Sequence, residues 1–204
     1  MNSSSFRKYF DHFLPNGTSA YCFGLWEKHN FTFKIKPPRQ TKLGDYKFDR
    51  RSRQHTITIN NDLNPYSFLV TYLHEVAHLV VQENYGSKVQ PHGEEWKSTF
   101  KNLMLPIFKL KVLPYEVQEG LMKYFKNPKA SSYADSSLMM LLGQYDQQKD
   151  DLVYLKTLQQ GDQFRLNNRV FVKGEKKRTR SLCTEKSTGR RFMVLEMARV
   201  EPYY

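Results

Sequence analysis

A long helical pattern of apolar residues occupies the middle of the chain. It begins at Asn64-Pro65, a favourable N-cap and first-turn pair, and runs to about Tyr85, where Gly86 closes it. Its apolar residues recur every three or four positions, at Phe68, Leu69, Tyr72, Leu73, Val76, Leu79 and Val80. This spacing predicts a helix buried in a core.

Shorter periodic segments surround this helix. Apolar spacing and turn residues predict four further helices, at 6–13, 19–29, 94–104 and 115–125. Thr18 is a candidate N-cap for the second of these, and Pro106 follows the third. Three segments of alternating residues predict a small antiparallel sheet, at 31–36, 42–48 and 55–60.

The character of the chain changes after residue 125. Residues 126–151 are small and polar, with one short predicted helix at 138–145, and we interpret them as a linker. Alternating segments separated by hairpin turns then predict strands at 163–166, 170–173, 178–184, 192–196 and 198–200. We therefore expect an α+β protein in which residues 1–125 form the first domain and residues 152–204 a small, basic, β-barrel-like module.

Charge is concentrated in this second part. The net charge of the chain is +12, of which residues 151–204 contribute +6 in about a quarter of the length. A basic surface attracts polyanions such as DNA or RNA. Candidate nucleic-acid contacts are Lys176, Lys177, Arg178, Arg180, Arg190 and Arg191. The interleaved Phe164, Phe171 and Phe192 either stack on bases or fill the core of the module.

Several classes of protein are disfavoured by the sequence. Cys22 and Cys183 are too few for a disulfide framework or for a four-cysteine zinc site. No run of eighteen apolar residues is present, and the first residues lack the apolar core and cleavage site of a secretory signal. We expect a cytoplasmic protein without a membrane partner.

The central helix carries an H-E-x-x-H motif, from His74 to His78. Residues four apart on a helix share a face, so both imidazoles can reach one metal ion. Glu75 is turned by about 100° from His74 and can lie beside the metal without binding it. There it can take a proton from water whose pKa the metal has lowered to about 7, which predicts metal-assisted hydrolysis.

A catalytic zinc site needs a third protein ligand. His92 is the best candidate, because the thirteen residues between His78 and His92 allow the chain to turn and return. Glu94 and Glu95 are rivals, since a carboxylate serves as the third ligand in other zinc enzymes.

These residues resemble the SprT-like metallopeptidases, the group that contains bacterial SprT and eukaryotic Spartan. The resemblance covers residues 15 to 125 and rests on four segments: 71–78 with the motif, His92-Gly93-x-x-Trp96-Lys97, and the strands at 42–46 and 57–60. It implies a minimal zincin-like fold, one catalytic zinc ion on His74, His78 and His92, and Glu75 as the catalytic base. In Spartan the activity is cleavage of proteins crosslinked to DNA. Many relatives carry a cysteine-rich zinc ribbon, which this chain cannot form.

We therefore expect a zinc-dependent peptidase that acts on protein substrates, including proteins associated with or crosslinked to DNA, with single-stranded DNA as a possible partner. Two alternatives remain open at this point. One is a nucleic-acid-binding protein with a structural zinc ion, and the other is a zinc-dependent nuclease or other hydrolase with the same ligands.

Overall fold

The computed structural model describes residues 3–39, 42–126, 136–146 and 152–204. The chain divides into two compact units, Met1–Asp146 and Gln147–Tyr204. Most of the predicted linker, at 127–135 and 147–151, lies outside the described residues. No helix in the described part of the chain is long and apolar enough to cross a membrane.

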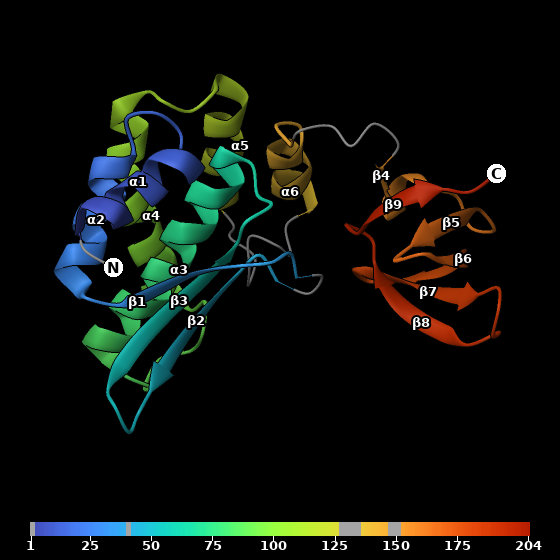
Figure 1. Cartoon of the computed structure of the whole chain (residues 1–204), viewed down its shortest axis with the longest axis horizontal. Helices are drawn as coiled ribbons and strands as arrows, with labels where there is room; N and C mark the ends of the chain where they lie inside the picture. The colour runs from blue at the N-terminus through green and yellow to red at the C-terminus, as the bar shows by residue number, and fades with distance from the viewer. Residues whose placement is uncertain (1–2, 40–41, 127–135, 147–151) are drawn as a thin grey trace. The chain divides into compact units, whose positions relative to one another are not determined.

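The first unit contains a three-stranded sheet with the order β1-β3-β2 (Figure 1). Its strands are β1 (Thr32–Lys36), β2 (Gly44–Asp49) and β3 (Gln54–Asn60). The expectation of an antiparallel sheet is wrong for one pair, because β1 pairs with β3 in parallel while β2 pairs with β3 antiparallel. The segment between β1 and β2 reverses the chain once and the β2–β3 hairpin reverses it again, which restores the direction of β1.

Six helices accompany this sheet in the described residues of the first unit. They are α1 (Ser3–Phe13), α2 (Ser19–His29), α3 (Pro65–Tyr85), α4 (Glu94–Leu110), α5 (Tyr115–Lys126) and α6 (Ser136–Gly143). The long helix α3 packs against β2 and β3 and is buried along most of its length. Its buried side chains fill the centre of the hydrophobic core of the first unit. This packing fixes the position of the H-E-x-x-H motif on α3.

Both ends of α3 follow the expectation from sequence. The side-chain oxygen of Asn64 accepts hydrogen bonds from the backbone N–H groups of Tyr66 and Ser67, at 3.1 and 3.0 Å. The amide nitrogen of Asn64 donates to the carbonyl oxygen of Leu142 in α6, at 2.9 Å. Leu142 is itself buried in the first core, so the helix predicted within the linker belongs to the first unit.

Two details of the other helices differ from expectation. Thr18 does not cap α2 with its side chain, because its hydroxyl donates to the carbonyl oxygen of Pro15 at 2.7 Å. Helix α4 continues through Pro106, which we expected to follow its end. The cost of an internal proline is offset here because Phe100, Met104 and Ile107, on both sides of it, are fully buried in the core.

The second unit is an antiparallel sheet with the order β4-β9-β5-β6-β7-β8. Its strands are β4 (Val153–Tyr154), β5 (Gln163–Leu166), β6 (Arg169–Lys177), β7 (Arg180–Glu185), β8 (Arg191–Leu195) and β9 (Arg199–Pro202). The predicted barrel is wrong, because the sheet is not closed. β4 and β8 are its two edges, and the two-residue β4 pairs with β9 alone, which leaves no strand to complete a ring.

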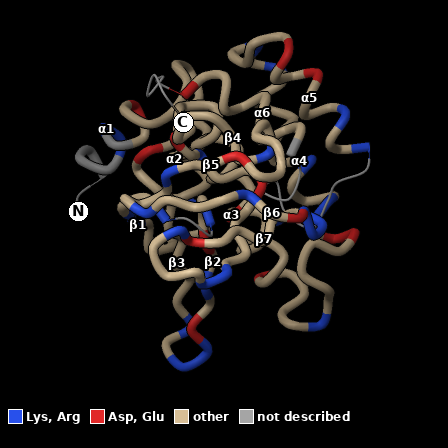
Figure 2. Tube along the Cα trace, turned by 90° about the vertical axis from the view of Figure 1, so that its right-hand side faces the viewer, with Lys and Arg blue, Asp and Glu red and all other residues tan. Residues whose placement is uncertain are grey.

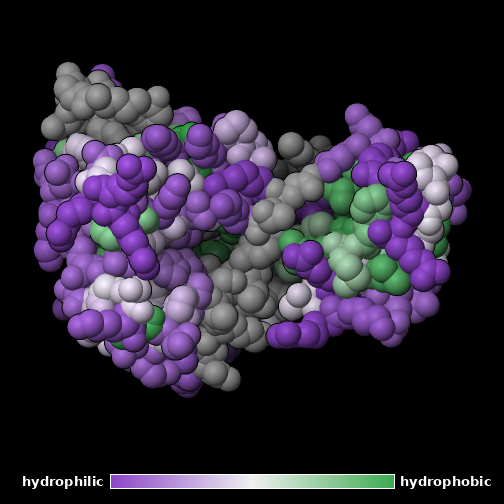
Figure 3. All heavy atoms as spheres, turned by 90° about the horizontal axis from the view of Figure 1, so that it is seen from below, coloured by the Kyte–Doolittle hydropathy of each residue, from purple (hydrophilic) through white to green (hydrophobic). Residues whose placement is uncertain are grey.

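One face of this sheet covers a small core, and the other carries apolar side chains as well. Phe164 and Phe171 are buried in the core, which supports the core interpretation of these rings over base stacking. On the outer face Leu182 and Met193 stand opposite each other on β7 and β8, and Met193 is exposed. Hydrophobic residues gather on the side of this unit seen in Figure 3.

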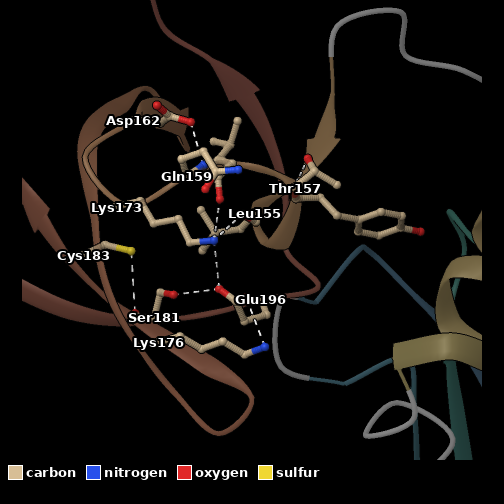
Figure 4. Close-up of polar contacts among 11 residues, drawn as sticks. Leu155, Thr157, Gln159, Asp162, Lys173, Lys176, Ser181, Cys183 and Glu196 are labelled. Atoms are coloured by element: carbon tan, nitrogen blue, oxygen red, sulfur yellow. Dashed lines mark hydrogen bonds and ion pairs between the residues drawn. The ribbon is translucent and has the colours of Figure 1, made fainter.

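The core of the second unit also holds a buried ion pair (Figure 4). The ammonium group of Lys173 donates to the carbonyl oxygens of Leu155 and Leu158, at 2.8 and 2.9 Å. It lies 3.3 Å from the carboxylate of Glu196, which also accepts a hydrogen bond of 2.6 Å from Ser181. Each charge therefore has partners, as buried charges require.

Candidate metal centre

Three histidine side chains meet beside α3. His74 and His78 lie one turn apart on this helix, and their Nε2 atoms are 3.3 Å apart. The Nε2 atom of His92 lies 3.2 Å from that of His74. The ligand atoms of the three residues all lie within 4.8 Å of one another, so the group could hold a metal ion.

His92 reaches this position through an unusual backbone conformation. It has a φ angle of 59°, in the left-handed region, two residues before α4 begins at Glu94. The next residue, Gly93, approaches the carbonyl oxygen of Gln90 so closely that an added Cβ atom would lie only 3.0 Å from it. This tight turn brings a residue from outside α3 back to the two histidines of the helix.

The spacing of the three nitrogens fits a tetrahedral zinc ion. With Zn–N distances of about 2.0 to 2.1 Å, neighbouring ligand nitrogens in a tetrahedron lie about 3.3 to 3.4 Å apart. The observed separations from His74, 3.3 and 3.2 Å, match this value. Three convergent nitrogen lone pairs repel one another unless a cation or a proton lies between them, so the arrangement suits a bound metal ion.

Burial keeps the imidazoles in the form that binds metals. It lowers the pKa of His74 well below its usual value, with His78 and His92 adding to the effect. Burial, together with His92, lowers the pKa of His78 to about 3, and burial also lowers the pKa of His92. All three rings are therefore neutral at neutral pH, and a neutral imidazole offers a lone pair to a metal.

The indole ring of Trp96 packs against the rings of all three histidines. Its ring centroid lies 4.5 Å from that of His74, 5.4 Å from that of His78 and 4.7 Å from that of His92. The Nε1 atom of Trp96 and the Nδ1 atom of His74 are buried and have no hydrogen-bond partner within the described residues. Such unpaired buried groups cost stability, so the surroundings of the cluster are not optimised for stability alone.

Glu75 lies against β2, an edge strand of the three-stranded sheet. A Cβ atom added to Gly44 would stand 2.6 Å from Oε1 of Glu75 and 2.6 Å from Cγ2 of Thr71. Only glycine allows the strand to approach the helix this closely. Burial raises the pKa of Glu75 to about 8, and the nearby Asp45 adds to the rise. A cation on the histidines would lower this pKa again by direct attraction.

Tyr46 is a residue of the site that sequence reasoning missed. Its ring stacks on His78 at a centroid distance of 6.3 Å, and its hydroxyl forms a hydrogen bond of 2.8 Å with Nδ1 of His55. Alternation along β2 places Gly44, Tyr46 and Phe48 on one face. That alternation was visible in the sequence, but only the fold shows that this face meets α3.

The rival ligands lie outside the histidine cluster. The side chain of Glu94 is exposed and forms an ion pair with Lys97 at 2.7 Å. Within the described residues, the group able to hold a metal contains His74, His78 and His92 and neither Glu94 nor Glu95. Tyr72, on the same helix, is buried away from the cluster, and its hydroxyl donates to the carbonyl oxygen of Cys22 at 2.8 Å.

The candidate nucleic-acid contacts fall into two groups in the second unit. Lys176, Lys177, Arg178 and Arg180 surround the β6–β7 turn, and Arg190 and Arg191 lie at the start of β8. The pairing of Arg180 with Leu195 and of Thr184 with Arg191 places the groups at opposite ends of β7, roughly 13 Å apart. Two of these cations have acidic neighbours: Lys177 pairs with Glu175 at 3.0 Å, and Lys176 lies 3.9 Å from Glu196.

Comparison with known proteins agrees with this site. The model of the SprT-like family matches residues 6–116. The chain is also similar to the proteins named Protein SprT of Pseudomonas fluorescens strains SBW25 and Pf0-1, with 56% identity over 27 residues in each case. These matches cover 13% of the chain and 16% of each of those proteins. No solved structure matches the chain.

The family match includes all of the residues that form the histidine cluster, together with Glu75 and the β2 strand beside it. It extends over more than half of the 204 residues. The chain therefore belongs to the SprT-like family.

Proposed function

We propose that the first unit is a zincin-like peptidase in which His74, His78 and His92 hold a zinc ion and Glu75 is the general base. The observation that carries this proposal is the convergence of three neutral imidazoles at tetrahedral spacing, next to a buried carboxylate on the same helix. A purely structural metal site does not need that carboxylate, whose burial is costly. Zinc is proposed because nitrogen ligands in tetrahedral geometry suit it well.

A zinc ion bound there would supply Lewis acidity, which makes water a better nucleophile and polarises the carbonyl of the substrate. Glu75 would accept the proton that the water loses as it attacks the peptide carbonyl. The same carboxyl group would then transfer this proton to the departing amine, so that one residue acts first as base and later as acid. Gly44, which lies against Glu75, would leave the carboxylate little room to move away during either step.

The edge of the sheet offers a place for the substrate backbone. In the described residues β2 pairs with β3 on one side and with no strand on the other. An extended peptide can add to such an edge through main-chain hydrogen bonds, which binds many sequences and favours unfolded segments of a protein. Because Gly44 and Tyr46 of β2 lie beside Glu75 and His78, a peptide on this edge would pass the proposed metal.

The test is substitution of Glu75 by glutamine. We expect Glu75→Gln to retain zinc, measured by elemental analysis, and to reduce cleavage of denatured casein by a factor of about 10² to 10⁴. Glu27→Gln, a matched change at an exposed glutamate of α2, should leave cleavage unchanged. Wild-type activity in Glu75→Gln would show that Glu75 is not the base. Zinc binding with cleavage of RNA or DNA but not of protein would favour a nuclease.

A second proposal concerns the basic unit. We propose that it binds nucleic acid and so directs the peptidase to proteins associated with or crosslinked to DNA. The supporting observation is that Arg178 and Arg180 are exposed, and no ion pair engages either of them within the described residues. Arg178→Gln with Arg180→Gln should weaken binding of a single-stranded oligonucleotide and reduce the slope of log K against log salt. An unchanged slope would contradict this proposal.

A further inference from the structure

A polar pocket of about 540 Å³ lies at the far end of the β2–β3 hairpin in the first unit. Its volume falls in the range of roughly 300 to 1,000 Å³ that small-ligand sites occupy. Six of the residues that form its walls carry the argument: Phe48, Arg50, Arg53, His55, Gln82 and Glu83. The first four come from the hairpin and the last two from the end of α3.

The pocket continues the face of α3 that carries the histidines. Gln82 follows His78 by four residues, so it lies roughly 6 Å further along the same face of the helix. On the strand side, the ring of Tyr46 lies 6.3 Å from His78 and 5.9 Å from His55. His55 in turn lies 4.7 Å from Phe48. A continuous line of side chains therefore leads from the histidine cluster into the pocket.

The charges of the pocket favour an anionic ligand. The side chains of Arg50 and Arg53 have no ion pair with any acidic residue in the described part of the chain. The carboxylate of Glu83, the one acidic residue of the wall, forms a hydrogen bond of 2.7 Å with Nδ1 of His29. Asp49, at the base of the turn, accepts hydrogen bonds from the backbone N–H groups of Arg51 and Ser52. Figure 2 shows the tip of the β2–β3 hairpin coloured mainly as Lys and Arg.

We propose that this pocket is a substrate subsite that selects an acidic side chain, aspartate or glutamate, close to the bond that is cleaved. The inference rests on the proposed peptidase function. A peptide on the edge of β2 advances about 3.3 Å per residue, so the step of roughly 6 Å beyond His78 corresponds to about two residues from the scissile bond. The two guanidinium groups would bind the carboxylate of that residue, and Phe48 would contact its methylene groups.

The experiment measures selectivity within one peptide. A peptide that spans a bond cleaved in denatured casein is synthesised with either Glu or Gln at each position up to three residues from the bond. For the zinc-loaded full chain, we expect kcat/KM to be about tenfold higher with Glu than with Gln at one position about two residues away. The Arg50→Gln, Arg53→Gln double variant should reduce this ratio to about one.

Arg51→Gln is the matched control, because Arg51 is exposed in the same turn but does not line the pocket. It should retain the tenfold ratio. The proposal is overturned if no position prefers Glu, or if the preference survives in the double variant. It is also overturned if the double variant loses affinity for a single-stranded oligonucleotide while the Glu/Gln ratio stays the same, since the arginines would then bind phosphate.

Peptide binding separates failure of the subsite from failure of the peptidase proposal. Fluorescence anisotropy with Glu75→Gln measures the affinities of the Glu and Gln peptides without any cleavage. A Glu preference that disappears with Arg50→Gln and Arg53→Gln supports the subsite even if the wild type cleaves nothing. Equal affinities of the two peptides for Glu75→Gln overturn the subsite, whatever the activity of the wild type.

Discussion

Each unit buries ionisable groups, but the two units treat them differently. In the second unit Lys173 and Glu196, each 6% exposed, are joined to each other and to Ser181 and two backbone carbonyls. In the first unit His74 is equally buried, yet its Nδ1 atom has no partner within the described residues and its Nε2 atom faces two other imidazoles.

The contrast distinguishes a structural network from a binding site. A buried polar group with all its partners contributes to a defined fold, whereas an incomplete set costs stability unless a ligand completes it. The network of Lys173 is complete within the chain. In the cluster around His74 the Nε2 atoms of three imidazoles face one another without a group of opposite charge, so a bound metal ion would complete the cluster. We therefore propose ligand binding at the His74 cluster and a structural role for the Lys173 network.

The largest effect is expected from breaking the complete network. Lys173→Met should lower the free energy of unfolding of the second unit by about 3 to 5 kcal/mol, because it leaves Glu196 as an uncompensated buried charge. Labelling of the buried Cys183 during urea unfolding reports on this unit, and labelling of Cys22 reports on the first. Lys176→Met, which removes an exposed cation 3.9 Å from the same carboxylate, should cost less than about 1 kcal/mol. Equal effects of the two changes would refute the contrast.

The next largest effect concerns the close packing of the Glu75 carboxylate against Gly44. Gly44→Ala places a Cβ atom within 2.6 Å of Oε1 of Glu75, so either the carboxylate or the strand must move. A displacement of about 1 Å at a catalytic group reduces the rate by up to about a hundredfold, while zinc content should not change. The readouts are kcat with casein peptides and zinc by elemental analysis. Gly24→Ala, where an added Cβ meets nothing within 4 Å, is the control. Normal turnover in Gly44→Ala would mean that the close approach has no catalytic role.

A smaller effect on stability is expected from removing the imidazole of His74. In the metal-free chain, His74→Leu should change the free energy of unfolding of the first unit by no more than about 1 kcal/mol, because an unpaired imidazole is replaced by an apolar side chain of similar size. Added zinc should raise the unfolding midpoint of the wild type and leave that of His74→Leu unchanged. A loss of several kcal/mol without metal would show that His74 already has a structural role comparable to that of Lys173.

The smallest effect concerns the loss of stability in acid that results from protonation of Glu185. Hydrogen bonds from Arg169 and then Thr188 lower the pKa of Glu185 to about 2. A lowered pKa stabilises the folded state above the unfolded pKa of about 4.3, and this contribution disappears as pH falls toward 2. Hydrogen exchange of the amides in β6 and β7 gives the free energy of opening of these strands. The difference in this free energy between wild type and Glu185→Gln should therefore be constant above about pH 5 and shrink below it. A difference that does not depend on pH would exclude ionisation of Glu185 as its cause.

Local patterns in the sequence predicted much of the fold. The bounds of α2 and α3 were predicted to the residue, and every strand of the described residues except β4 was found within a few residues of expectation. The two-residue β4 was not predicted. These elements depend on caps, turns and periodicity, which act over a few neighbouring residues. The continuation of α4 through Pro106 escaped prediction because burial of residues on both sides of the proline overrides its local preference.

The candidate site was also predicted only in part, because local patterns determine some of its residues and long-range packing determines the others. The relation of His74, Glu75 and His78 follows from the geometry of a single helix, so the sequence alone determined it. The position of His92 depends on a left-handed turn before α4, and the sequence allowed Glu94 and Glu95 as well.

Only the tertiary structure decided what surrounds the motif. It brought Gly44 against Glu75, Tyr46 onto His78 and the arginines of the β2–β3 turn next to the end of α3. It also left the second sheet open and separated its cations into two groups along β7. The physical reason is that these contacts join residues far apart in the chain, and their partners are chosen by packing of whole elements, which no local pattern of residues specifies.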